Sequence, residues 1–146
     1  MYARILAGID GSAQGEHALR HAVGLAKACG AALRIVHVVD MGWLPVGPEL
    51  GIDIERLIDS RRANGKKLLA DAVELARKAG FAAQARLVET AAPTQPAAAL
   101  LEEATSWPAD VVVLGTRGRS GLERLLLGSM ADGVARRSTI PLTLVP

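Results

Sequence analysis

The chain has 146 residues, enough to bury one core and too short for two, so we expect a single domain over residues 1–146. Hydrophobic residues make up 50% of the sequence but aromatic residues only 3%, which favours packed helices and buried strands and argues against stacking of single-stranded nucleic acid. The formal net charge of +2, without a basic stripe, also argues against a polyanionic partner.

A strand, a turn and a helix are predicted at the start of the chain. Residues 2–9 form a short apolar segment that ends at the turn Asp10-Gly11-Ser12, whose side chains can cap a following helix. Apolar residues then recur with helical spacing up to Cys29, and Gly30 predicts a left-handed end. Residues 32–39 are nearly all apolar and rich in β-branched side chains, which is typical of a strand covered on both faces.

The middle of the chain predicts a loop, a long helix and an edge strand. Residues 40–53 mix Pro and Gly with apolar residues around Trp43, which indicates a loop that covers or moves over a site. A helix is predicted over residues 54–79, weakened at Gly65 and closed by Gly80. In the next segment, beginning at Phe81, apolar residues alternate with a period of two, which favours a strand with one less buried face.

Two more helices and two more strands complete the chain. A short alanine-rich helix is predicted over residues 97–105, followed by the most uniformly apolar strand, residues 111–114, which we expect in the middle of the sheet. Residues 128–137 predict the last helix, and residues 141–145 the last strand. Alternating strands and helices with right-handed crossovers give a doubly wound, mainly parallel α/β sheet with helices on both faces.

Ligands of such sheets bind beyond the carboxyl ends of the strands, where the strand order reverses, so the turns at Asp10 and Gly115 are the predicted site. Gly115 follows a buried strand, and Gly128 opens a helix whose free N–H groups attract phosphate. An alternative remains open, in which these glycines only form a tight turn. No Walker A motif or GxGxxG motif is present. Further phosphate donors are predicted from Arg117, Arg119 and Ser129.

The pattern G-x2-G-x9-G-S, complete at Gly115, Gly118, Gly128 and Ser129, resembles the nucleotide signature of the universal stress protein (UspA) family. The resemblance extends over the whole chain and includes Asp10, the pair His37-Val38 and the closing strand Pro-Leu-Thr-Leu-Val. It implies a Rossmann-like five-stranded sheet in the order 3-2-1-4-5. It also implies a nucleotide site in which Asp10 binds the ribose hydroxyls and the Val38 backbone reads the adenine edge. The glycines and Ser129 are implied to hold the ribose and phosphates. The expected set of nucleotide-binding residues is Ile9, Asp10, Val38, Leu114, Gly115, Arg117, Gly118, Arg119, Gly128, Ser129 and Met130.

The chain departs from the family pattern at two places. Ala91-Ala92-Pro93 stands where many members have a Gly-x-Pro turn, and Ala131 stands where members often have Ser or Thr. Ala131 removes one predicted phosphate donor, although the backbone donors remain.

No catalytic residue is predicted. His17 and His21 lie four residues apart without a third metal ligand and are interpreted as an exposed helix face. His37 is predicted to be a hydrogen-bonded core histidine, and Asp10 with Ser12 to be a helix cap rather than an acid and a nucleophile. A response-regulator receiver is not supported, because Asp10 is the only acidic residue directly after the first strand.

The leading hypothesis is a homodimeric stress-response regulator that binds ATP, with or without Mg²⁺, and changes its shape or its choice of partner. The final strand is apolar enough to pair across a twofold axis. A slow ATP hydrolase and a dimeric scaffold without nucleotide are the alternatives. The lone cysteine, Cys29, is predicted to be a buried thiol, which fits a reducing compartment. No signal or membrane-spanning segment is recognisable. These two observations predict a soluble cytoplasmic protein without a membrane partner.

Overall fold

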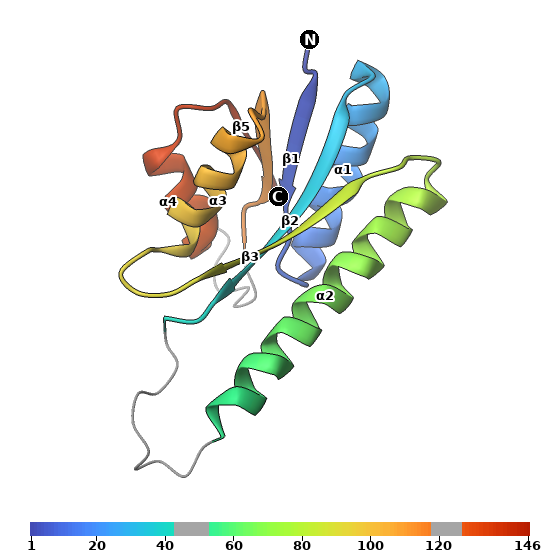
Figure 1. The fold of residues 1–146 in the computed structure, drawn as a ribbon. Coiled ribbons are helices and arrows are strands. Elements are labelled where there is room, and N and C mark those ends of the chain that lie inside the picture. Colours follow the sequence, from blue (N-terminus) through green and yellow to red (C-terminus); the bar gives the residue numbers. More distant parts are fainter. Residues whose placement is uncertain (43–52, 118–126) are drawn as a thin grey trace.

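The computed structural model describes residues 1–42, 53–117 and 127–146, in which strands and helices alternate (Figure 1). The strands are β1 (Arg4–Gly8), β2 (Ala32–Asp40), β3 (Gln84–Thr90), β4 (Val111–Gly115) and β5 (Leu142–Val145). The helices are α1 (Ala13–Cys29), α2 (Ile54–Lys78), α3 (Pro96–Ser106) and α4 (Ser129–Arg137).

The strands form one parallel sheet in the order β3-β2-β1-β4-β5. This order confirms the predicted doubly wound fold, with β3 and β5 at the two edges. Since β1 pairs with both β2 and β4, the chain changes direction across the sheet on either side of β1. The carboxyl ends of β1 and β4 therefore flank the switch point at which α/β proteins of this type bind ligands.

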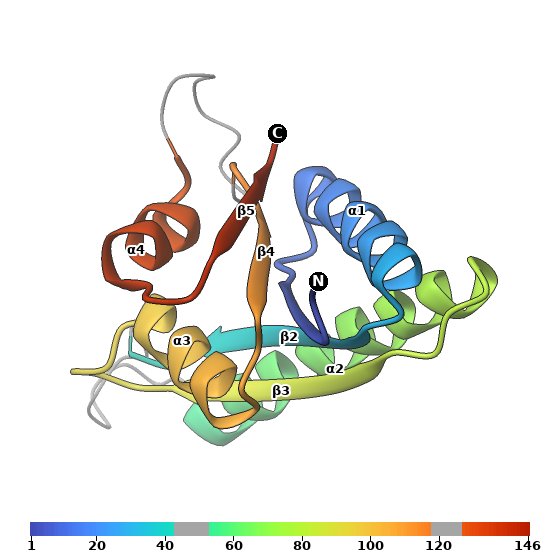
Figure 2. The ribbon, with the colours of Figure 1, turned by 90° about the horizontal axis from the view of Figure 1, so that it is seen from above.

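The helices form two layers, with α1 and α2 on one face of the sheet and α3 and α4 on the other (Figure 2). Successive residues of each interior strand point to opposite layers. Because helices cover both faces of the sheet, most residues on both sides of these strands are apolar. Toward α1 and α2 the strands direct Ile5, Leu33, Ile35, Val111 and Val113, and toward α3 and α4 they direct Leu6, Val36, Val112 and Leu114.

The end of α2 explains why β3 begins later than predicted. Gly80 has a left-handed backbone (φ 81°), its N–H donates to the Arg77 carbonyl, and the N–H of Phe81 donates to the Ala76 carbonyl at 2.9 Å. These two bonds form a Schellman cap, in which Phe81 packs back on the helix and core. The strand therefore starts at Gln84, three residues after its predicted start.

Gly65 was predicted to weaken α2, but the helix continues unbroken through it. Gly65 is buried, and a β carbon built on it would lie 2.7 Å from Leu87 Cδ1 and 3.1 Å from His37 Cδ2. The missing side chain lets α2 lie close against β2 and β3. The glycine thus has a packing reason, which outweighs its low helix propensity.

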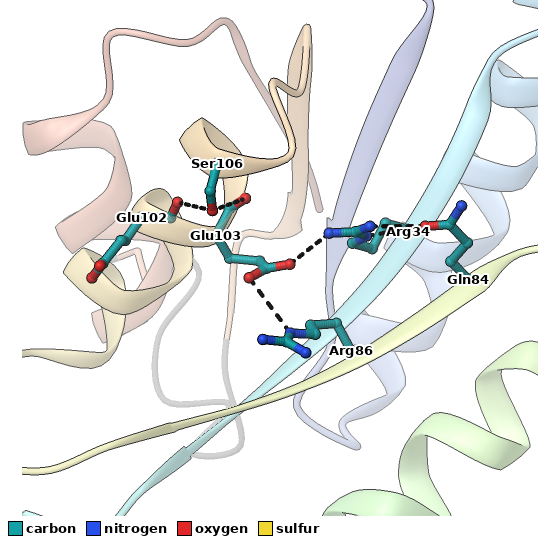
Figure 3. Close-up of polar contacts among 6 residues, drawn as sticks. All are labelled: Arg34, Gln84, Arg86, Glu102, Glu103 and Ser106. Atoms are coloured by element: carbon teal, nitrogen blue, oxygen red, sulfur yellow. Dashed lines mark hydrogen bonds and ion pairs between the residues drawn. The ribbon is translucent and has the colours of Figure 1, made fainter.

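A polar network outside the apolar core joins α3 to β2 and β3 (Figure 3). Arg34 of β2 donates to Glu103 of α3 at 2.7 Å and to Gln84 of β3 at 3.0 Å, and its guanidinium stacks 4.5 Å from the ring centre of Trp107. Arg86 adds a second cation, 3.6 Å from the Glu103 carboxylate, whose side chain is only 12% exposed. The network ties α3 to the edge of the sheet through charge-assisted bonds.

The N-terminal strand is anchored by Asp110, which precedes β4. The Asp110 carboxylate accepts the backbone N–H groups of Arg4 at 2.8 Å and Ala3 at 2.7 Å. These bonds, from Arg4 first and then Ala3, favour the charged carboxylate and hold the pKa of Asp110 below its ordinary value.

Candidate functional site

A cavity of about 520 Å³ lies at the carboxyl ends of β1, β2 and β4, beside the start of α4. Its size is within the range of roughly 300–1,000 Å³ that is usual for sites of small molecules. Its lining contains nine of the eleven residues predicted to bind nucleotide, namely Ile9, Asp10, Val38, Leu114, Gly115, Arg117, Gly128, Ser129 and Met130. The other two, Gly118 and Arg119, lie outside the described residues, as does Trp43 in the predicted covering loop.

The turn after β1 is organised by Asp10. Its Oδ1 accepts the backbone N–H of Ser12 at 2.9 Å and the Ser12 hydroxyl at 2.5 Å, while Ser12 Oγ accepts the N–H of Gly15 at 3.0 Å. These bonds confirm the predicted helix cap at Ser12, and they direct the hydroxyl proton toward a carboxylate. A β carbon on Gly15 would lie 2.8 Å from Asp10 Oδ1, so this glycine lets the carboxylate lie against the first turn of α1.

The backbone of β2 passes the end of β1 at Val38. The N–H of Ile9 donates to the Val36 carbonyl at 2.9 Å, and beyond this point β1 turns away into the loop at Asp10. Because alternate residues of a strand direct their backbone groups to the same side, those of Val38 point past the end of β1 toward the cavity. They are therefore placed to pair with the edge of a planar ligand.

Backbone hydrogen bonds hold the residue directly after β4 and the residue directly before α4. The N–H of Thr116 donates to the Val145 carbonyl at 2.9 Å, and the Thr116 carbonyl accepts the N–H of Gly128 at 2.7 Å. Helix α4 begins at Ser129, and no side chain of the described residues caps it. The first N–H groups of α4 thus lie at the cavity together with the positive end of the helix dipole, an arrangement that favours an anion.

Gly115 has a packing reason that the sequence did not reveal. A β carbon on Gly115 would lie 3.1 Å from the carbonyl oxygen of Gln14 and 3.4 Å from the nitrogen of Gly15. Its small size therefore lets the end of β4 lie against the first turn of α1. This contact brings the two predicted halves of the site, Asp10 and the glycine loop, next to one another.

Sequence reasoning missed the wall of the cavity that α2 provides. Arg61, Asn64, Gly65 and Leu68 line the cavity from this helix. Their spacing of three, one and three residues is that of one helix face, and the buried Gly65 marks the close contact with the sheet. These two signals identify the face but not the element that it covers. Asp40, Pro96 and Leu100 also line the cavity and were not predicted.

The other residues singled out in the sequence are His17 and His21 on α1, His37 beside the cavity, and Cys29. His17 and His21 are exposed as predicted, and the described residues contain no group of three His, Cys, Asp or Glu that could hold a metal. His37 Nδ1 lies 2.8 Å from the Ile9 carbonyl oxygen, which confirms the predicted hydrogen bond, but the residue is half-buried and lines the cavity instead of lying in the core. Cys29 is free but only partly buried, in contrast to the buried thiol expected. None of the helices in the described ranges is long and apolar enough to span a membrane.

The fold and the cavity define a doubly wound α/β protein with a ligand site at the switch point of its sheet. The model of the universal stress protein family matches residues 1–146, and the chain belongs to this family. It is 34% identical to the universal stress protein YxiE of Bacillus subtilis, over 99% of each chain. It is also similar to the solved structure of the universal stress protein UspA from Lactobacillus plantarum, with a TM-score of 0.84 at 22% identity, over 99% of this chain and 98% of the other.

Two other similar structures contain adenine nucleotides. One is a universal stress protein in complex with cAMP, 29% identical, with a TM-score of 0.73 over 99% of this chain and 97% of the other. The second is the universal stress protein from Archaeoglobus fulgidus in complex with dAMP, 24% identical, with a TM-score of 0.65 over 99% of this chain and 98% of the other.

Proposed function

We propose that this protein binds an adenine nucleotide, ATP, in the cavity and acts as a nucleotide-dependent regulator or binding module of the stress response. The observation that carries the proposal is the convergence of the turn after β1, the end of β2 and the start of α4 on one cavity. These segments are far apart in the sequence, and each provides a different part of a nucleotide site. The relative that is 29% identical and was solved with cAMP supports the same ligand class.

The residues of the cavity suit the three parts of a nucleotide. The Asp10 carboxylate accepts hydrogen bonds from ribose hydroxyls, and the backbone of Val38 pairs with the adenine edge. The N–H groups at the start of α4 and the hydroxyl of Ser129 donate to phosphate oxygens. Arg117 adds a positive charge and bidentate donors for the distal phosphates.

The phosphate end depends mainly on backbone donors and Arg117. Ala131 is buried and lines the cavity where a hydroxyl would have added another donor. Two carboxylates, Asp10 and Asp40, also line the cavity. Mg²⁺ is usually held by one or two carboxylates together with the phosphates of a substrate, so we expect any Mg²⁺ to enter with ATP.

We further propose that β5 pairs with the β5 of a second copy to form a homodimer. Among the described strands, β5 lies at the edge of the sheet and pairs on one side only, and its residues Leu142, Thr143 and Leu144 are only half-buried in the single chain. Pairing across a twofold axis would satisfy this edge. A molecular mass of one chain by light scattering, at micromolar concentration, would refute the dimer. A cytoplasmic location remains a prediction.

The nucleotide proposal is tested by denaturing the purified protein and identifying any released nucleotide by chromatography, followed by calorimetric titration of ATP, AMP and GTP. Arg117→Ala is expected to weaken ATP binding about tenfold or more and AMP binding less, because the charge contacts distal phosphates. The matched control is Arg136→Ala on the exposed side of α4, where Arg136 pairs with Asp132 and with no other residue in the described ranges, and it should leave both affinities unchanged.

The outcomes separate the three hypotheses for this site. A wild-type protein without bound nucleotide that also gives no heat with ATP refutes the proposal and leaves the scaffold hypothesis. ATP that binds and stays intact in the presence of Mg²⁺ supports a binding module. ADP released over many turnovers identifies the protein as a hydrolase.

A further inference from the structure

His37, on β2, lines the cavity, and its imidazole has no part in the nucleotide site proposed above. Its Nδ1 lies 2.8 Å from the carbonyl oxygen of Ile9. A carbonyl oxygen can only accept a hydrogen bond, so Nδ1 carries a proton and donates it. In the neutral ring Nε2 then has a free lone pair and is an acceptor. The bond to Ile9 therefore fixes the tautomer.

The ring is also fixed in orientation. A β carbon on Gly65 would lie only 3.1 Å from His37 Cδ2, so the backbone of α2 packs against that side of the ring. Nδ1 and Cδ2 are the two ring atoms bonded to Cγ, and Ile9 and Gly65 hold them from two sides. The outer end of the ring, which contains Nε2, takes no part in either contact.

Nε2 is accessible from outside the protein. Every buried side-chain nitrogen and oxygen of the described residues has a hydrogen-bond partner. His37 Nε2 has none within the described part of the chain, so it is not a buried atom. His37 lines the cavity, and Asn64 and Leu68 of α2 line the same cavity. The neutral ring thus places a hydrogen-bond acceptor beside the cavity in one tautomer and one orientation.

We propose that His37 is a specificity-determining residue, whose Nε2 accepts a hydrogen bond from a donor group of the bound nucleotide. This inference rests on the proposed adenine-nucleotide site. Adenine nucleotides have two kinds of neutral donor, the 6-amino group of the base and the ribose hydroxyls. Reading of the 6-amino group would also select against hypoxanthine and guanine, which have an acceptor oxygen at that position.

Two substitutions separate the two nitrogens of the ring. His37→Asn keeps an amide N–H close to the Nδ1 position, where it can donate to Ile9, but has no atom at the Nε2 position. His37→Gln extends to the outer position and keeps an acceptor there. We expect His37→Asn to weaken ATP binding about five- to tenfold, as for the loss of one neutral hydrogen bond in a cavity, and His37→Gln to recover most of this loss.

Two analogues of ATP identify the donor by calorimetric titration. Purine riboside triphosphate lacks the 6-amino group, and 2′,3′-dideoxy-ATP lacks both ribose hydroxyls. The analogue without the donor that His37 reads should bind the wild type and His37→Asn equally, whereas the other analogue should retain the difference. Nitrogen-15 NMR of the wild-type imidazole gives a readout that needs no variant, because the Nε2 resonance should move when ATP is added.

The results that overturn the inference differ from those that overturn the proposed function. Equal ATP affinity of the wild type and a folded His37→Asn overturns the inference alone. If His37→Asn lowers the affinity for ATP and for both analogues equally, the inference is also overturned, because His37 then only shapes the site. An Nε2 resonance that does not move in saturating ATP overturns it as well. A wild type that binds no adenine nucleotide refutes the proposed function and the inference with it.

Discussion

Two helical glycines, Gly24 in α1 and Gly65 in α2, form a matched pair that measures how tightly α2 packs on the sheet. Gly24 is exposed, and a β carbon there would meet nothing within 4 Å. A β carbon at the buried Gly65 would lie 2.7 Å from Leu87 Cδ1 and 3.2 Å from Val39 Cγ2. The same substitution, glycine to alanine, therefore enters open solvent in one helix and a filled interface in the other.

The expected magnitudes follow from these contacts. Gly24→Ala gains helix propensity without a steric cost, so we expect it to raise the free energy of unfolding by about 0.5–1 kcal/mol. Gly65→Ala has the same gain but must displace buried neighbours, which costs about 1–3 kcal/mol. Leu87 is half-buried on an edge strand and its Cδ1 can move, so the cost should be in the lower half of this range. Gly65→Ala should thus be less stable than Gly24→Ala by about 1–2 kcal/mol.

Urea unfolding followed by circular dichroism measures both variants against the wild type. For a chain of this length, a difference of about 1–2 kcal/mol corresponds to roughly 3–8 °C in Tm. Unchanged m values would show that the denatured state is the same in both variants. If Gly65→Ala were as stable as Gly24→Ala, the close packing of α2 against β2 and β3 would be refuted.

Two further predictions concern charged residues. The N–H donors of Arg4 and Ala3 hold the pKa of Asp110 below its ordinary value of 3.8. The charged Asp110 carboxylate therefore stabilises the fold fully above that pH, and this stabilisation is lost as the pH falls through the lower pKa of the folded state. Urea unfolding from pH 2 to 7 should therefore show a weaker pH dependence for Asp110→Asn than for the wild type, and parallel curves would contradict this. Glu103→Gln should lower the free energy of unfolding by about 1–2 kcal/mol, because it removes the charge that pairs with Arg34. A double-mutant cycle with Arg34→Met that gave no coupling energy would show that the pair contributes nothing.

The order and type of the elements could be predicted because each interior strand is largely apolar on both faces and each break contains a turn residue. Gly30 is an example, since its left-handed backbone (φ 64°) ends α1 as predicted. The start of β3 could not be located, because Phe81 suits both an alternating strand and the apolar position of a helix cap. Only the bond from Phe81 to Ala76 distinguishes the two.

The candidate site could be predicted where its residues lie at strand ends and not where they lie on a helix face. Asp10 and Gly115 follow strands, and topology brings the carboxyl ends of parallel strands together. Arg61 and Asn64 are on a helix whose spacing shows which residues share a face but not what that face covers. The reason for Gly115 was also hidden, since the carbonyl of Gln14 that it contacts lies about one hundred residues away in the sequence.

The bond between Thr116 and Gly128 has a consequence for how the length of this chain between the two residues can vary. Thr116 is bonded to Val145 of β5 on one side and to Gly128 on the other, so the described residues just before and just after positions 118–126 lie close together. The positions of Gly115 and Ser129 are then set by the sheet and by α4, and not by the number of residues between them. Because doubling the length of a loop costs only about 0.6 kcal/mol in closure entropy, insertions in this segment should leave the anion-favouring end of α4 in place.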